Sequence, residues 1–126
     1  MENREFSKLP ENRTKTFALS VIRLSASLPN TAEARVIKNQ ITKSGTSIGA
    51  NYREANRARS RADFVNKIKI CASKAGETVY WLELTADLDW FDPLKIQTIN
   101  AEANELLAIF TSIGIKLKQH SPNSKF

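Results

Sequence analysis

Hydrophobic residues recur three and four positions apart along most of the chain, which is the spacing of one face of an α-helix. This pattern predicts four helices, over residues 11–28, 30–57, 60–88 and 93–119. Apolar and polar residues never alternate for long enough to predict a strand. Because the connections are short, consecutive helices must run antiparallel. The chain is therefore predicted to be an all-α, up-down-up-down four-helix bundle.

Each predicted helix carries one stripe of residues that we expect to be buried. The stripes are Phe17, Val21, Leu24 and Leu28, widened by Ala18 and Ile22; Ile37, Ile41, Ser44, Ile48, Tyr52 and Ala55; Phe64, Ile68, Cys71, Ala75, Val79, Leu82 and Ala86; and Ile96, Ile99, Ala103, Leu106, Phe110, Ile113 and Leu117. Gly45 and Gly49 interrupt the second segment, although each glycine costs a helix roughly 1 kcal/mol relative to alanine. We therefore expect another helix to approach closely there.

Capping residues mark the predicted helix ends. Asn30 with Glu33, and Ser60 with Asp63, have the spacing of capping boxes. Pro29 stops the first helix, and Asp92 and Pro93 suit the start of the fourth. The bundle is expected over residues 11–119, with a flexible arm at 1–10 and a disordered tail at 120–126.

Length and composition indicate a single domain of ordinary globular type. The 126 residues are 41% hydrophobic, and no apolar run approaches the ~20 residues needed to span a bilayer. The polar start does not resemble a secretory signal, and a single cysteine excludes an internal disulfide. We expect a cytoplasmic protein without a membrane partner.

Positive charge is concentrated in the first part of the chain. The net charge is +6, and residues 1–74 hold 15 Lys and Arg against 6 Asp and Glu, whereas residues 75–126 hold 4 and 7. A basic protein of this kind favours an anionic partner.

Signatures of catalysis and of metal binding are missing from the sequence. Gly45 and Gly49 lack the strand and lysine of a phosphate-binding loop, and His120 is the only histidine. Cys71 falls on an apolar stripe, which favours a buried side chain over a reactive thiol. The carboxylates Glu54, Asp63 and Glu77 lack the Glu-x-x-His pairs of carboxylate-bridged bundles. We expect no cofactor, metal, small-molecule substrate or enzymatic activity.

Polar residues in the middle of the second and third helices need partners, because an unpaired polar group on a buried face is costly. Some of the residues Asn51, Arg53, Glu54 and Glu77 are expected to form a polar network between these helices. Contact with a ligand is the alternative, and stabilisation of the bundle is favoured.

Large apolar residues off the stripes are candidates for contact with another subunit. They are Leu107, Ile109 and Ile115 in the fourth helix and Trp81 and Trp90 near the end of the third. Tyr80, Trp81, Trp90 and Phe91 are surrounded by acidic residues, which repel phosphates. A role in the core or in subunit contact is therefore favoured over stacking on bases.

The basic residues around the second turn are the candidate nucleic-acid site. They are Arg53, Arg57, Arg59 and Arg61, joined along the third helix by Lys67, Lys69 and Lys74. An antiparallel hairpin brings the arginines to one tip, where they either contact phosphates or are merely solvated. Several copies in one assembly would strengthen phosphate binding, because the electrostatic effect grows with each phosphate neutralised.

The residues that carry a family resemblance lie in the same part of the chain. They are the run from Ser44 to Ala55, with Ser60, Asp63, Phe64, Lys67 and the run from Glu77 to Leu82. At these spacings the chain resembles, over residues 11–119, the four-helix-bundle proteins encoded in 23S ribosomal RNA intervening sequences. That family is similar to the accessory variability proteins of diversity-generating retroelements.

The resemblance implies a basic bundle that assembles into a ring, most often a homopentamer, and binds nucleic acid or a nucleic-acid enzyme. Two hypotheses follow. The chain is either a non-catalytic accessory protein that binds RNA or DNA with little sequence preference, or a scaffold that holds a protein partner such as a reverse transcriptase.

Overall fold

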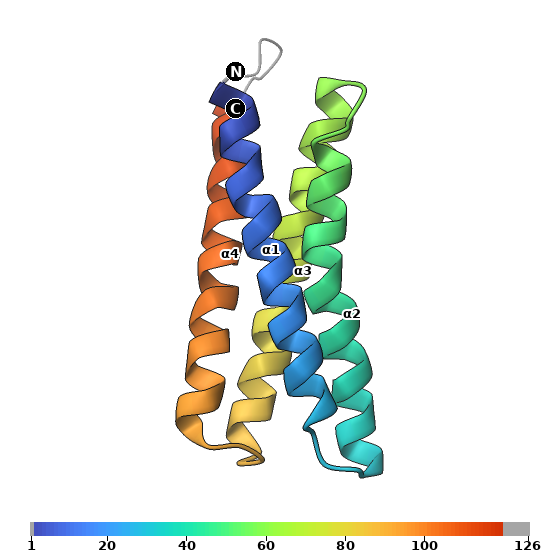
Figure 1. The fold of residues 1–126 in the computed structure, drawn as a ribbon. Coiled ribbons are helices and arrows are strands. Elements are labelled where there is room, and N and C mark those ends of the chain that lie inside the picture. The colour runs from blue at the N-terminus through green and yellow to red at the C-terminus, as the bar shows by residue number, and fades with distance from the viewer. Residues whose placement is uncertain (1, 120–126) are drawn as a thin grey trace.

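A computed structural model describes the backbone of residues 2–119 and the side chains of residues 11–119, and it contains four helices. These are α1 (Glu2–Ala26), α2 (Ala32–Ala55), α3 (Arg61–Asp87) and α4 (Pro93–Gln119). The helices run alternately up and down beside one another in a long, narrow bundle (Figure 1). No strand occurs in this part of the chain. The predicted all-α, antiparallel architecture is confirmed.

The first helix is longer than the sequence pattern predicted. It begins at Glu2, so residues 2–10, which were expected to form an arm, are helical. Pro10 lacks one backbone donor, but the residues before it include Glu, Arg, Lys and Leu, which have high helix propensity. One missing hydrogen bond therefore does not end the helix. The tail at 120–126, including His120, lies outside the described residues.

Two of the predicted helix starts are confirmed, and one is wrong. The Ser60 hydroxyl accepts a hydrogen bond from the Asp63 amide at 3.1 Å, and Asp92 Oδ1 accepts one from the Leu94 amide at 2.9 Å. The cap of α2, however, is Thr31 rather than Asn30, and its hydroxyl accepts from the Ala34 amide at 3.1 Å. A capping side chain accepts from the amide two or three residues after it, and at the start of α2 it is Thr31 that meets the Ala34 amide.

The predicted stripes form the core, and a second, smaller cluster closes one end of the bundle. The main cluster contains Phe17, Val21, Ile41, Ile48, Ile68, Leu82, Leu106 and Phe110. Leu28, Ala34 and Ile37 form the smaller cluster, against which Trp81, Trp90 and Phe91 pack. The expectation for Ile22 is wrong, because this side chain faces outward and is 46% exposed.

A pair of buried hydroxyl groups joins α2 to α3 within this apolar seam. Thr78 Oγ1 donates to Ser44 Oγ at 2.9 Å and also lies 2.7 Å from the Lys74 carbonyl oxygen. The Cys71 thiol donates to the Ile48 carbonyl oxygen at 3.5 Å. Ser44, Thr78 and Cys71 therefore each have a partner, which avoids the cost of desolvation.

Helix α1 packs closely on α2, as the glycines predicted. A Cβ atom at Gly45 would lie 2.8 Å from Val21 Cγ1, and one at Gly49 would lie 3.0 Å from Thr14 Oγ1. One turn from Val21, the Thr42 hydroxyl donates to Ser25 Oγ at 2.8 Å. Small side chains thus allow the two backbones to approach.

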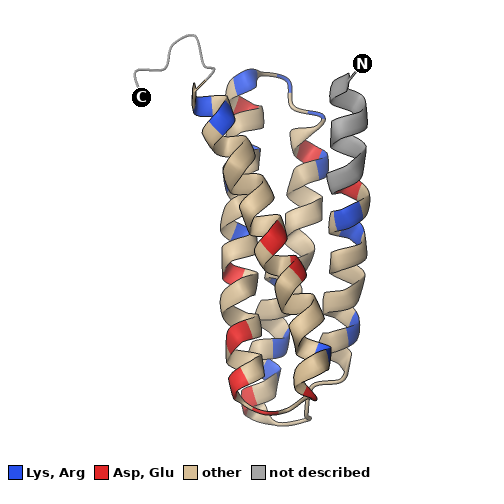
Figure 2. Ribbon diagram, turned by 90° about the vertical axis from the view of Figure 1, so that its left-hand side faces the viewer, with Lys and Arg blue, Asp and Glu red and all other residues tan. Residues whose placement is uncertain are grey.

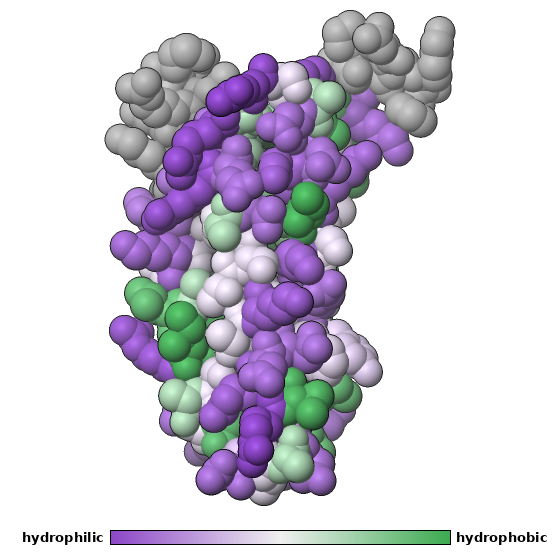
Figure 3. Space-filling view, turned by 90° about the vertical axis from the view of Figure 1, so that its right-hand side faces the viewer, coloured by the Kyte–Doolittle hydropathy of each residue, from purple (hydrophilic) through white to green (hydrophobic). Residues whose placement is uncertain are grey.

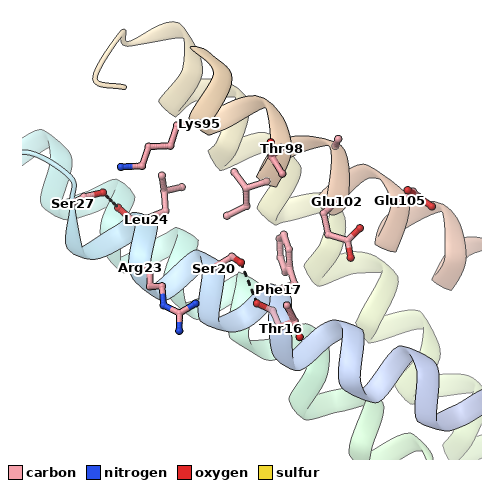
Figure 4. A pocket seen from close by; sticks show the side chains of 12 residues that line it. Thr16, Phe17, Ser20, Arg23, Leu24, Ser27, Lys95, Thr98, Glu102 and Glu105 are labelled. Atoms are coloured by element: carbon pink, nitrogen blue, oxygen red, sulfur yellow. Dashed lines mark hydrogen bonds between the residues drawn. The ribbon is translucent and has the colours of Figure 1, made fainter. Parts of the chain in front are cut away.

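Helix α1 and helix α4 leave a groove between them. Its volume is about 620 Å³ (Figure 4), and its lining includes the buried side chains of Phe17, Leu24 and Ile99. Arg23 and Lys95 also line the groove, together with Glu102 and Glu105. The lining carries charges of both signs, so it does not favour an anionic ligand.

An ion-pair clamp spans the same two helices. Arg13 Nε donates to Glu102 Oε2 at 2.7 Å, Arg13 Nη2 donates to Glu102 Oε1 at 2.8 Å, and Arg13 Nη2 lies 3.2 Å from Glu105 Oε1. The hydrogen bonds to Glu102 raise the pKa of Arg13 above its ordinary value. The contact between α1 and α4 therefore depends more on charge than the contact between α1 and α2.

Candidate nucleic-acid interface

The two ends of the bundle differ in charge (Figure 2). One end, which we call the basic tip, is built from the last turn of α2, the α2–α3 turn, the first turns of α3 and the last turn of α4. Its basic residues are Arg53, Arg57, Arg59, Arg61, Lys67, Lys116 and Lys118, and the acidic residues around them are Glu11, Glu54 and Asp63. Seven basic residues against three acidic ones, within the described chain, make this end positive.

Arg57 and Arg59 are solvent-accessible charges of the basic tip. Both are exposed, and both lie in the connection between the end of α2 and Ser60, the cap of α3. Neither side chain forms a hydrogen bond or an ion pair with any of the residues whose side chains are described. Their guanidinium groups are therefore available to an anion from solution.

Arg53 and Arg61 are partly engaged within the protein. Arg53 Nε lies 4.0 Å from Glu11 Oε1, a long ion pair, and Asn56 Nδ2 donates to Glu11 Oε2 at 2.6 Å. Arg61 Nη2 donates to the Leu117 carbonyl oxygen at 2.6 Å. The last carbonyl groups of a helix have no partner inside it, so Arg61 caps α4 and complements the negative end of its dipole.

Lys67 and Glu54 join α3 to α2 near the tip. Lys67 Nζ donates to Glu54 Oε1 at 2.7 Å. This hydrogen bond lowers the pKa of Glu54 and raises the pKa of Lys67. The pair is solvated, so we assign it little stability, but it neutralises a carboxylate that would otherwise repel phosphates.

The remaining predicted basic residues lie away from the tip. Lys74 is thirteen positions beyond Arg61, or roughly 20 Å along the helix axis, and its Nζ lies 3.5 Å from Glu77 Oε2. Lys69 is exposed on α3 between them. The structure therefore gathers the four arginines and Lys67 at one end, but leaves Lys69 and Lys74 on the side of the bundle.

Of the four residues named for the predicted polar network between α2 and α3, Glu54 is the one that links these two helices among the described residues. Glu54 binds Lys67, as described above. Asn51 Nδ2 donates to the Ser47 carbonyl oxygen of its own helix at 2.8 Å, and Glu77 pairs with Lys74 within α3. Helix spacing alone does not distinguish a bond to a neighbouring helix from a bond to the preceding turn.

Lys116 and Lys118 were missed as members of the basic tip. They lie in the last turn of α4, about 55 positions after Arg61 in the sequence, but an up-down-up-down topology places the end of α4 beside the start of α3. The sequence contained the information needed to find them, because the predicted helix order places the end of the fourth helix, with these two lysines, beside the start of the third.

The opposite end combines acidic and aromatic residues. Glu83, Asp87, Asp89 and Asp92 are exposed, but Arg35 and Lys95 lie at the same end, which is therefore mixed in charge (Figure 2). Trp81, Trp90 and Phe91 are half-buried against the smaller core cluster. These three rings serve the fold of the single chain.

The predicted subunit-contact residues differ in exposure. Leu107 and Ile109 are half-buried and pack against the main core of their own chain. Ile115 is 52% exposed, and Leu19 and Ile22 of α1 are also exposed. The surface that contains α2 is mainly hydrophilic, with separate hydrophobic areas (Figure 3).

The Cys71 thiol and the acidic side chains were the other candidates for chemistry. Cys71 is fully buried, and this burial raises the pKa of its thiol to about 12. No group of three His, Cys, Asp or Glu side chains is placed to hold a metal ion within this part of the chain. None of the described helices has a stretch apolar enough to cross a bilayer.

Comparison with known proteins identifies the relatives of this chain. Residues 11–112 match the family model of the 23S rRNA-intervening sequence protein. The chain is similar to a crystal structure of a protein of unknown function from the S23 ribosomal protein family of Bacteroides thetaiotaomicron. The two are 39% identical with a TM-score of 0.77, and the match covers 82% of this chain and 96% of that one. A search of curated proteins found no match.

Proposed function

We propose that this chain, which belongs to the family of 23S rRNA-intervening sequence proteins, is a non-catalytic protein that binds nucleic acid through its basic tip. The observation that carries the proposal is the pair Arg57 and Arg59, which are exposed and have no partner among the described side chains. Arginine binds phosphate through a planar fork of donors and keeps its charge at any physiological pH.

The proposed contact is electrostatic and does not depend on sequence. Each phosphate that a basic side chain neutralises releases counterions, so affinity falls as salt concentration rises. Two of the three carboxylates near the tip are already bound, Glu54 by Lys67 and Glu11 by Asn56. The positive potential of the arginines is therefore only partly offset by the protein itself.

We also propose that several copies assemble so that their basic tips lie together. Exposed Ile115, Leu19 and Ile22 supply apolar surface for such contacts. The family resemblance implies a ring of five subunits. Joining several weak sites raises the effective concentration of each one, which compensates for the few charges of a single tip. Light scattering of the purified protein measures the number of copies.

The test replaces Arg57 and Arg59 together with glutamine. Arg61 is left in place because its guanidinium caps α4. We expect the double variant to bind a labelled mixed-sequence nucleic acid at least tenfold more weakly in low salt. The slope of log affinity against log salt should also fall by roughly one for each lost contact per subunit. Fluorescence anisotropy at several salt concentrations measures both quantities.

A matched control removes two exposed arginines at the opposite end, Arg23 and Arg35. This variant has the same net charge as the first and should bind nearly as well as the unchanged protein. Equal weakening by both variants would show that only total charge matters. Unchanged affinity of the tip variant in low salt would reject the proposal. Circular dichroism verifies that both variants fold.

A further inference from the structure

We infer that the basic tip selects double-stranded over single-stranded nucleic acid. The inference rests on the proposed function and adds the class of ligand. Its basis is that the tip offers cations to phosphates but offers no described aromatic ring to bases.

The aromatic side chains nearest to the tip are committed to the core. Tyr52 lies one turn before Asn56 but is only 4% exposed, and its ring meets Phe110 edge to face at 5.2 Å. Burial also raises the pKa of its hydroxyl. Phe64, in the first turn of α3, packs against the main core cluster. Tyr52 is therefore closed to an unpaired base, and Phe64 is half-buried, so only part of its ring is open to solvent.

The exposed aromatic residue of α3 is too far from the tip to serve the same strand. Tyr80 is 54% exposed, but it stands nineteen positions after Arg61, roughly 28 Å along the helix. Its neighbours include Glu77 and Glu83, which repel phosphates. Proteins that hold single strands interleave such rings with basic residues along one groove, and this chain separates the two.

A site made of cations favours the ligand with the higher density of phosphates. Double-stranded DNA carries one charge per ~1.7 Å of its axis, twice the density along one strand. A duplex therefore places more phosphates within reach of Arg57, Arg59 and the lysines of the tip. A single strand gains affinity chiefly by stacking its bases, which this surface does not support.

The rigidity of the tip favours the same ligand. Ser60 caps α3, the amide of Asn56 donates to the Tyr52 carbonyl oxygen at 3.1 Å, and Arg61 ties α3 to the end of α4. These bonds hold the backbone from which Arg57 and Arg59 project. A duplex has regularly spaced phosphates and needs no ordering to meet that backbone, whereas a flexible single strand must be ordered, which costs binding free energy.

The experiment compares two labelled DNA probes that hold equal numbers of phosphates. One is a mixed-sequence duplex of about 24 base pairs, and the other is a single strand without self-complementarity whose length gives the same total charge. At the same salt concentration we expect the duplex to bind at least tenfold more tightly. The Arg57→Gln/Arg59→Gln variant should lose affinity for the duplex.

A second variant tests whether any base stacks on the exposed ring. Tyr80→Leu removes the aromatic face far from the basic tip, and it should leave the affinity for both probes unchanged. A loss of single-strand affinity in this variant would overturn the inference, because it would show that bases reach the ring.

The failure of the inference can be distinguished from the failure of the proposed function. If the single strand binds as tightly as the duplex and still depends on Arg57 and Arg59, the inference is wrong while the proposed function stands. If neither probe binds in low salt, the proposed function itself is wrong, and the inference falls with it.

Discussion

The two sides of α1 are packed in different ways, and the difference lies in the size and charge of a few residues. Toward α2, Gly45, Gly49 and Ser25 leave room for close contact. Toward α4, a groove of about 620 Å³ stays open, and Arg13 reaches across to Glu102 and Glu105. Figure 1 shows α1 leaning toward α2 at the end where α1 meets the α1–α2 connection.

This comparison shows how one helix is positioned by unequal neighbours. Shape complementarity holds α1 on α2, because the glycines let side chains of α1 pack directly against the backbone of α2. Charge and hydrogen bonds hold α1 on α4, where close packing is not reached. Salt should therefore have little effect on the α1–α2 contact, and a larger side chain there should destabilise the protein. The α1–α4 contact should weaken in salt, and a larger side chain should fit there.

The largest contrast is expected when the same substitution is made on the two sides of α1. Ser25 is 5% exposed and accepts a hydrogen bond from Thr42, so Ser25→Leu adds volume to a filled space and removes a partner. We expect a loss of about 3 kcal/mol in the free energy of unfolding. Ser20→Leu, on the groove side, should instead stabilise by about 0.5 kcal/mol.

Urea denaturation of the two leucine variants measures this contrast directly. Among the described residues the Ser20 hydroxyl bonds to the Thr16 carbonyl oxygen of its own helix, so its removal leaves no buried group there without a partner. Similar losses from both substitutions would show that the groove side of α1 is as tightly packed as the α2 side.

The second contrast is between two glycines. Gly45→Ala places a Cβ atom 2.8 and 2.9 Å from the two methyl groups of Val21, which is fully buried and has no room to move. We expect a net loss of about 2 kcal/mol, because overpacking exceeds the gain in helix propensity. Gly114→Ala meets no atom within 4 Å and should stabilise by up to about 1 kcal/mol.

A compensating change sharpens this test. Val21→Ala should remove the clash, so the double variant Gly45→Ala/Val21→Ala is expected to be more stable than the sum of the two single changes predicts. Additive losses in thermal melts would contradict the proposed contact.

The smallest effect is expected from the clamp between α1 and α4. Arg13→Gln removes the ion pairs to Glu102 and Glu105, and we expect a loss of about 1 kcal/mol in low salt because the groups are partly solvated. High salt should abolish most of the difference. Lys74→Gln, which breaks an ion pair within α3, should have almost no effect in the same denaturation series. A loss that persists in high salt would point to packing rather than charge.

The sequence predicted most of the fold because period and volume are local properties. The hydrophobic stripes predicted the core residues, and Gly45 and Gly49 predicted that another helix lies close to α2. The pattern did not indicate that this helix is α1. The predicted start of α1 was wrong because Pro10 does not end the helix formed by the good helix formers before it. The cap of α2 was wrong by one residue because Asn30 and Thr31 are both good caps.

The candidate site was predicted only in part, because it depends on topology as well as composition. Arg57 and Arg59 follow directly from the position of the turn. Lys116 joins the basic tip only because α4 ends beside the start of α3. Lys74 was grouped with the arginines by closeness in sequence, whereas each helical residue adds about 1.5 Å of separation. The family resemblance seen in residues 44–55 is confirmed.

The hydroxyl pair of Ser44 and Thr78 has a consequence for how α2 and α3 are aligned lengthwise. A row of aliphatic side chains can slide by one helical turn and still find apolar neighbours, but two single hydroxyls meet at only one offset. The 2.9 Å bond between them therefore fixes the register of α2 against α3. The same register sets how far Arg57 and Arg59, in the α2–α3 connection, project beyond the end of the bundle.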